Sequence, residues 1–135
     1  LITQYQTSSF YRSDKDLEIG PYPLRIGRDR VTDENSEIEF VNSSNNLLNF
    51  PNKITQNDFD GWIQERGLYF ADSWSDQYET VFKMKDEGET ELEGSLLHAK
   101  YGKGNYIFTG LSFFRQLPVG VPGAYRLLAN LIAVE

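Results

Sequence analysis

The stretch SLLHAKYGKGNYIFTGLSFF, from Ser95 to Phe114, decides the fold of this 135-residue chain. It reads as two strands joined at YGKG, because apolar and aromatic residues flank a short run rich in glycine. Leu97 and Ala99 alternate with Leu96 and His98, so the two pairs lie on opposite faces of the first strand. We therefore predict that His98, the single histidine, is a mid-strand residue with a structural role.

The segment that follows predicts a helix near 122–133. In VGVPGAYRLLANLIAVE, Pro122 suits the first helical position, where its missing N–H costs nothing. Apolar residues then recur at the spacing of a core-facing stripe: Ala124, Leu127, Leu128, Leu131 and Ile132. We expect this helix to pack on the sheet.

The rest of the chain alternates short strands and turns. LITQYQ at the start and SEIEFVN from Ser36 read as strands, a polar loop covers SSFYRSDKD from Ser8, and PYPLRIGRDRV from Pro21 is extended and irregular. The predicted class is therefore α/β, with a mixed, strand-rich sheet, a short helix near 55–61 and the C-terminal helix near 122–133. We expect residues 1–135 to form a single domain or a fragment of one.

Charge and cysteine content exclude several functions. A net charge of −7 argues against nucleic acid as a partner, since that affinity comes mostly from clustered Lys and Arg. No stretch is apolar enough for a membrane span. The absence of cysteine excludes thiolate metal sites and a cysteine nucleophile. The acidic run KDEGETELEG, from Lys85 to Gly94, lacks the spacing of a calcium loop, so we predict a solvated loop and no metal site.

The stretch ITQNDFDGWIQERGLYF, from Ile54 to Phe70, combines acidic, basic, amide and aromatic side chains of the kinds found in binding and catalytic sites. Thr55 suits a helix N-cap, and Asp58 three residues on completes a shortened capping box. Gly61 is a natural end for this helix, and the aromatic and branched residues after it predict a strand. Trp62 would then fill the corner between the helix and the sheet.

Glu65 and Arg66 are adjacent, so on a strand they point to opposite faces and need separate partners. By residue type, Arg28 or Arg30 suits Glu65, and Asp58 or Asp60 suits Arg66. Phe114 and Arg115, in a loop rich in apolar residues, are candidates to line a pocket or an interface. The candidate residues for ligand binding or for a structural network are Trp62, Glu65, Arg66, Arg28, Arg30, Phe114 and Arg115.

Three long runs carry a family resemblance: NFPNKITQNDFDGWIQERGLYF, AKYGKGNYIFTGLSFFRQLPVGVPGAYRLLANLI and PYPLRIGRDRVTDE. They resemble the C-terminal region of large bacterial deacetylases of the PIG-L (LmbE-like) family. In those proteins a zinc-dependent N-acetylglucosamine deacetylase-like domain precedes further domains. The last of these resembles a class I glutamine-amidotransferase-like α/β fold, so this chain would be its later part.

The resemblance implies a role without catalysis for this segment. The metal-binding His-Pro-Asp-Asp run of the deacetylase has no counterpart here, and an amidotransferase would need a cysteine that the chain lacks. The implied role is an accessory domain in stability, assembly or substrate presentation, without a cofactor of its own. Its implied partners are other domains of the parent protein or a second copy, and the implied location is periplasmic or extracellular.

Two other functions stay open. A carbohydrate-binding module would stack sugars on exposed Trp62, Trp74 or tyrosines, with Gln64, Glu65 or Arg66 bonding hydroxyls. A carboxylate-pair hydrolase would use Asp58, Asp60 or Glu65, whose separation in space the sequence does not give. Burial of the two tryptophans distinguishes the first of these from an accessory domain.

Overall fold

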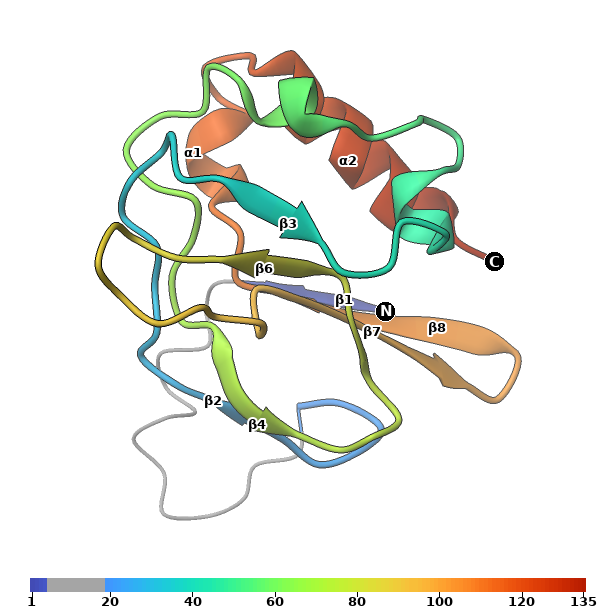
Figure 1. Ribbon diagram of the computed structural model, residues 1–135. Coiled ribbons are helices and arrows are strands. Elements are labelled where there is room, and N and C mark those ends of the chain that lie inside the picture. The colour runs from blue at the N-terminus through green and yellow to red at the C-terminus, as the bar shows by residue number, and fades with distance from the viewer. Residues whose placement is uncertain (5–18) are drawn as a thin grey trace.

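The computed structural model describes residues 1–4 and 19–135. Figure 1 shows a strand-rich, mixed α/β arrangement of small sheets with two α-helices. The predicted class is therefore confirmed at this level. The loop predicted from Ser8 to Asp16 lies outside the described residues.

The main sheet is built on the hairpin that the sequence predicts. Strand β7 (Leu96–Tyr101) pairs antiparallel with β8 (Gly104–Thr109) across a two-residue turn, in which Gly102 takes a φ of 57°. Strand β1 (Ile2–Gln4) lies parallel to β8, and β5 (Glu79–Thr80) lies antiparallel to β7. The strand order is β1-β8-β7-β5, with β1 at one edge.

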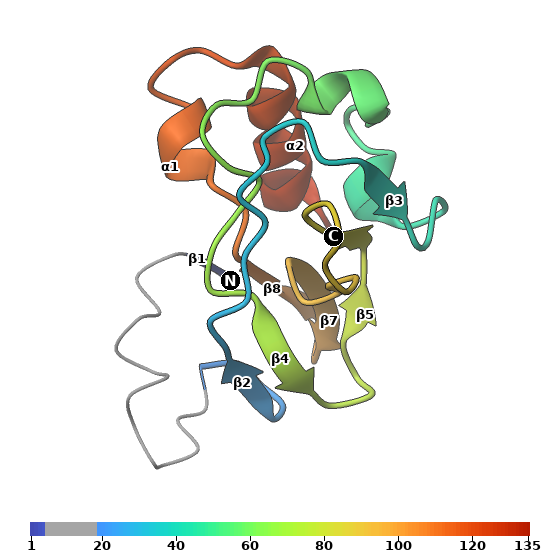
Figure 2. The same ribbon diagram turned by 60° about the vertical axis from the view of Figure 1, so that its left-hand side comes forward.

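Two smaller ladders lie on opposite faces of this sheet. Strands β2 (Leu24–Ile26) and β4 (Ala71–Trp74) pair antiparallel, as do β3 (Ile38–Phe40) and β6 (Phe82–Met84). Strand β3 confirms the alternation expected of SEIEFVN, because Ile38 is buried while Glu37 and Glu39 are exposed. The two views separate the β2–β4 ladder from the helical side of the molecule (Figures 1 and 2).

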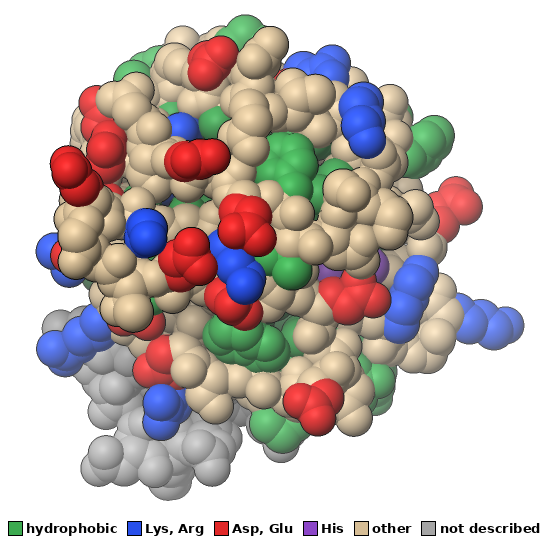
Figure 3. Space-filling model, in the orientation of Figure 1, with side chains coloured by type: hydrophobic (Ala, Val, Ile, Leu, Met, Phe, Trp, Pro, Cys, Tyr) green, Lys and Arg blue, Asp and Glu red, His purple; other side chains and the backbone are tan. Residues whose placement is uncertain are grey.

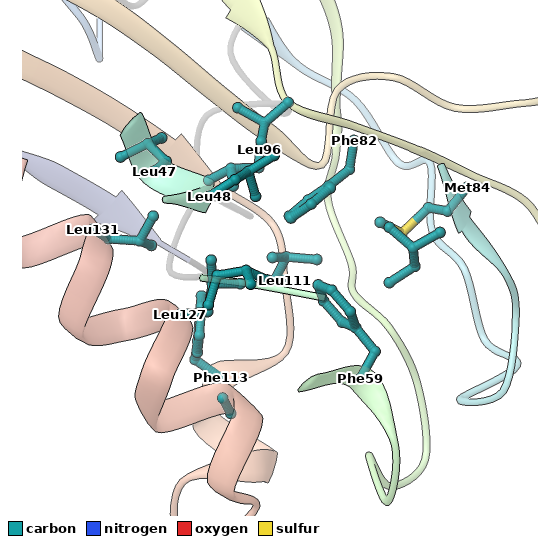
Figure 4. Close-up of a cluster of buried hydrophobic side chains, with 14 of the residues drawn as sticks. Leu47, Leu48, Phe59, Phe82, Met84, Leu96, Leu111, Phe113, Leu127 and Leu131 are labelled. Atoms are coloured by element: carbon teal, nitrogen blue, oxygen red, sulfur yellow. The ribbon is translucent and has the colours of Figure 1, made fainter. Parts of the chain in front are cut away.

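The helices gather on the face that also holds β3 and β6. Helix α2 (Pro122–Ala133) begins at the predicted proline, follows the four-residue α1 (Phe113–Gln116), and packs against the 3₁₀ helices η1 (Asn46–Leu48) and η2 (Gln56–Phe59). The larger core cluster fills the space between α2 and the sheet (Figure 4). Its central members include Phe59, Phe82, Leu111, Phe113 and Leu127.

The predicted stripe of α2 is wrong at one end. Ala124, Leu127 and Leu131 are buried, but Leu128 is half-buried and Ile132 is 69% exposed. The buried side of the helix instead includes Asn130, which has no exposed surface. The contacts with η1 and η2 rotate the helix so that its buried side is centred on Leu127, away from Ile132.

The second core cluster lies on the other face of the sheet. Alternate residues of β7 and β8 supply Leu97, Ala99, Tyr106 and Phe108, which pack against Leu24, Ile26 and Ala71 of the β2–β4 ladder and against Tyr78. The two strands are therefore buried on both faces. His98 is confirmed as a mid-strand residue, on the same face as Leu96.

Candidate functional site

The predicted helix and strand of residues 54–70 form only in part. The helix is present as η2, and its capping box is confirmed, with the Asp58 carboxylate accepting from the Thr55 N–H at 2.8 Å. The strand predicted after Gly61 is wrong. Positive φ angles at Gln64 (67°) and Tyr69 (54°) interrupt the extended backbone. Gly67 instead forms isolated β-bridges with Val31 and Leu111.

Trp62 is a buried corner residue. Its ring is 3% exposed and lies between Phe59 and Phe113, at 5.4 and 6.1 Å between ring centroids. The indole N–H donates to the main-chain carbonyl of Asp58 at 3.0 Å. The ring is therefore closed to a sugar, which removes the main support for stacking at this position.

Arg66 is a buried cation held by carbonyl groups. Its Nε and Nη2 donate to the carbonyl of Ser36 at 3.1 and 2.9 Å, and its Nη1 donates to the carbonyl of Phe59 at 2.7 Å. The guanidinium carbon lies 5.7 Å from the Phe59 ring centroid and 5.9 Å from that of Trp62, within cation–π range.

The charge of Arg66 is balanced at a distance. Burial lowers the pKa of the Arg66 guanidinium, and attraction to Asp33, Asp60 and Glu34 opposes that shift. The prediction that Asp58 or Asp60 pairs with Arg66 is therefore wrong for Asp58. That carboxylate binds Arg126, whose Nε donates to it at 2.6 Å.

Glu65 binds Arg115, whose Nε donates to the carboxylate Oε1. The prediction that Arg28 or Arg30 binds Glu65 is therefore wrong, because α1 places Arg115 beside Glu65. Arg30 instead lies near Asp86, where its charge stabilises that carboxylate. Arg28 is exposed. Arg115 also covers the half-buried Phe114 ring, at 4.8 Å from its centroid.

We call residues 58–66 the joint. Two polar side chains, one from α1 and one from the loop before it, fix the backbone of this joint. Gln116 accepts from the N–H of Ile63 at 2.8 Å and donates to the carbonyl of Ile63 at 3.0 Å, so its amide replaces a neighbouring strand. The Ser112 hydroxyl donates to the carbonyl of Glu65 at 2.6 Å. Both side chains are fully buried, and sequence reasoning missed both.

Asn130 performs the same task on helix α2. It donates to the carbonyls of Leu47 and Asn52 at 2.9 and 2.8 Å, and it accepts from the Asn52 N–H at 2.9 Å. The sequence contains a signal for this role of Asn130. Its amide lies three residues after Leu127, on the buried side of an apolar helix, and a buried polar side chain needs hydrogen-bond partners.

His98 lies outside this joint, on β7, where it is paired with Glu79 of β5 and Ile107 of β8. The ring is 7% exposed, and its Nε2 is 2.8 Å from Oδ1 of Asn105. Nδ1 is buried and has no hydrogen-bond partner within residues 1–4 and 19–135.

An acidic groove of about 550 Å³ runs along β3 and β6. Figure 3 shows acidic side chains over this part of the molecule, with basic ones among them, and the groove lining includes Lys83 and Lys85. The carboxylates lining the groove come from Asp33, Glu37, Glu39, Asp86, Glu87 and Glu91. No group of three or more potential ligand residues within the described ranges has the arrangement of a metal site.

Asp86, at the rim of this groove, has a clear structural role. Its carboxylate accepts from the N–H groups of Thr32 and Asp33 and from the Thr32 hydroxyl at 2.7–3.0 Å. Burial acts to raise the pKa of the Asp86 carboxyl, but these hydrogen bonds and the charge of Arg30 lower it below its usual value. The acidic loop is otherwise largely exposed, as predicted.

Comparison of the chain with protein-family models, curated proteins and solved structures finds no match. In the part of the chain that is described, no helix has the length and apolar character needed to cross a bilayer.

Proposed function

We propose that this chain is a noncatalytic accessory domain of a larger zinc-dependent N-acetyl-sugar deacetylase of the PIG-L (LmbE-like) type. Within that protein it contributes stability, assembly or substrate presentation. The observation that carries the proposal is the internal use of the polar residues between Asp58 and Arg66. The resemblance of three long sequence runs to the last domain of those deacetylases supplies the parent protein.

The hydrogen-bond geometry supports a structural role because a catalytic or binding group must direct polar atoms toward a substrate. Arg66 donates to two main-chain carbonyls, and Glu65 and Asp58 are each bound by an arginine. Substrate would have to displace these bonds, leaving buried polar groups unpaired at about 1–3 kcal/mol each. Such a joint holds the irregular segment 61–70 in one conformation.

A carbohydrate-binding module is the second candidate, and one observation favours it at another place. Tyr101 is 61% exposed and lies beside an apolar hollow of about 490 Å³, whose lining includes Pro21 and Tyr106. Tyrosine rings at such a hollow suit a sugar face. Saturable binding of a chitooligosaccharide that is lost in Tyr101→Ala would support this candidate.

An antibody against this chain tests the accessory-domain proposal in cells of its source. We expect the antibody to recognise a polypeptide much larger than 135 residues. The immunoprecipitate should release acetate from N-acetylated sugars, and a zinc chelator should stop that release. A recognised species of only the size of this chain would contradict the proposal, as would a large polypeptide without deacetylase activity.

The purified chain provides the complementary assay. The proposal expects no acetate release from the same sugars by this chain alone, with or without added zinc. Turnover by the chain that is lost in Glu65→Gln would instead support the carboxylate hydrolase.

A further inference from the structure

Two asparagines of the chain are each followed by a serine: Asn35 precedes Ser36, and Asn42 precedes Ser43. In such a pair the main-chain nitrogen of the serine can attack the side-chain amide carbon of the asparagine, because the small serine side chain leaves the path open. The attack forms a cyclic succinimide and expels ammonia, and water then opens the ring to aspartate or isoaspartate. The rate of this reaction depends on how the fold holds the attacking nitrogen.

The pair at Asn42 is accessible. Asn42 lies in the turn that follows β3 (Figure 1). It is half-buried, while Ser43 and Ser44 are exposed. Among residues 1–4 and 19–135, no group accepts a hydrogen bond from the Ser43 N–H. The Ser43 nitrogen can therefore attack without breaking a hydrogen bond of the fold.

Ser44 supplies hydrogen-bond donors to the reacting amide. Oδ1 of Asn42 accepts from the Ser44 N–H at 3.1 Å and from the Ser44 hydroxyl at 2.7 Å. When the Ser43 nitrogen adds to the amide carbon, negative charge develops on Oδ1. Donors already placed where charge develops lower the barrier of an acyl-transfer step. The main-chain carbonyl of Asn42 accepts from the Asn45 N–H at 3.1 Å, which holds the turn in this conformation.

The pair at Asn35 is held by the fold. The Ser36 N–H donates to the carbonyl of Asp33 at 3.1 Å, and Ser36 is buried. The Ser36 hydroxyl donates to the carbonyl of Lys85 at 2.8 Å, and its carbonyl accepts from the Arg66 guanidinium. Attack by the Ser36 nitrogen disrupts this set of bonds, so the reaction at Asn35 requires local opening of the structure.

We propose that Asn42 deamidates spontaneously in the folded protein, with Ser44 stabilising the intermediate, while the fold protects Asn35. The Ser43 nitrogen bonds to the side-chain carbon of Asn42, the bond from that carbon to Nδ2 breaks, and ammonia leaves with the proton of the attacking nitrogen. One water then opens the succinimide and leaves a carboxylate at the end of β3. Water is the single co-reactant, and this inference does not depend on the proposed deacetylase parent.

Peptide mapping by mass spectrometry tests the inference on the purified chain, incubated at neutral pH in heavy-oxygen water. The heavy oxygen marks residues that pass through the succinimide during the incubation. We expect Asn42 to convert at least about tenfold faster than Asn35 in the folded chain, because Asn35 reacts only after local opening. Unfolding in guanidinium chloride should accelerate conversion of Asn35 and leave that of Asn42 unchanged or slower.

Two variants separate the roles of the neighbouring residues. Ser44→Ala removes the hydroxyl donor and should slow conversion of Asn42 at least about threefold. Ser73→Ala, at an exposed serine of β4, is the matched control and should leave that rate unchanged. Arg66→Met removes the donors to the Ser36 carbonyl, so it should accelerate conversion of Asn35 and leave that of Asn42 unchanged.

The two rates also define the results that would overturn the inference. Equal conversion of Asn35 and Asn42 in the folded chain would show that the fold does not distinguish the two pairs. Faster conversion of Asn42 after unfolding would show that the turn protects this residue. A rate at Asn42 that Ser44→Ala leaves unchanged or raises would contradict the stabilising role of Ser44.

Discussion

The charged side chain of Arg66 stabilises the fold by binding main-chain carbonyl groups. Its guanidinium satisfies the carbonyls of Ser36 and Phe59, which come from segments far apart in the sequence. The planar fork of arginine reaches both carbonyls at once, whereas an ammonium is a single point charge. The residue therefore ties the end of η2 to the segment before β3.

We predict that Arg66→Met lowers the free energy of unfolding by about 3 kcal/mol, because it leaves two buried carbonyls without donors. Arg66→Lys should recover less than half of that loss. Urea unfolding followed by circular dichroism measures both values. Lys103→Met, at the exposed turn between β7 and β8, is the control and should change stability by less than about 0.5 kcal/mol. A loss below about 1 kcal/mol in Arg66→Met would show that the carbonyls find other partners.

Asp86 gives the molecule a defined pH dependence. Its folded-state pKa is lowered, so its contribution to stability is complete above the unfolded pKa of about 3.9 and is lost as the pH falls through the folded pKa. At neutral pH, Asp86→Asn should lower the free energy of unfolding by about 1–2 kcal/mol, because the NH₂ of the new amide would face the donor groups of Thr32 and Asp33. The difference from the native chain should shrink below about pH 4.

Unfolding measured from neutral to acidic pH checks this expectation. Glu89→Gln, in the same exposed loop, serves as the control and should behave as the native chain does. A difference between native and Asp86→Asn chains that stays constant with pH would rule out titration of Asp86 as its cause.

At the scale of elements, helix α2 depends on a close approach to η2. A Cβ atom at Gly123 would lie 1.8 Å from the carbonyl oxygen of Asp58, so the backbones meet without room for a side chain. Glycine is required here by contact and not by its φ angle. The same approach brings Arg126 to the Asp58 carboxylate.

Gly123→Ala should therefore destabilise the protein by about 3 kcal/mol or more, although alanine favours a helix. The two elements must separate to admit the methyl group, and the Arg126–Asp58 pair would be lost with them. Gly104→Ala is the matched control, since the nearest atom to its added Cβ is 3.8 Å away. Thermal unfolding of the two variants measures the contrast. Equal transition temperatures would contradict the close contact.

The elements also show what the sequence predicts well. The β7–β8 hairpin, β3 and α2 have strong local signals, namely a glycine turn, an alternation of period two and an N-terminal proline. The strand expected after Gly61 fails because Gln116 and Ser112, about fifty residues later, hold the backbone in an irregular path. Local patterns contain no information about such distant partners.

The same limit applies to the joint residues and their partners. Residue type singled out Trp62, Glu65, Arg66 and Arg115 as candidates for ligand binding or a structural network, and the capping box of Thr55 with Asp58 was predictable from spacing alone. The pairing of Glu65 with Arg115 depends on where α1 lies, which the sequence did not specify. Ile132 was wrongly predicted to face the core, because the helical period identifies the apolar stripe but not which side of the stripe neighbouring elements cover.

At the scale of the whole molecule, the sheet is covered on both faces. The β2–β4 ladder covers one face, and α2 with β3 and β6 covers the other. Hydrogen bonds and ion pairs inside the molecule account for the polar residues between Asp58 and Arg66.

The central claim is that the residues around Trp62 form a closed structural joint. Trp74→Phe leaves Trp62 as the single tryptophan, so its fluorescence reports on the joint alone. We predict blue-shifted emission, weak quenching by acrylamide and no change during titration with chitooligosaccharides. Emission typical of a solvent-exposed indole, or a saturable shift with sugar, would contradict the claim and make the joint a binding site.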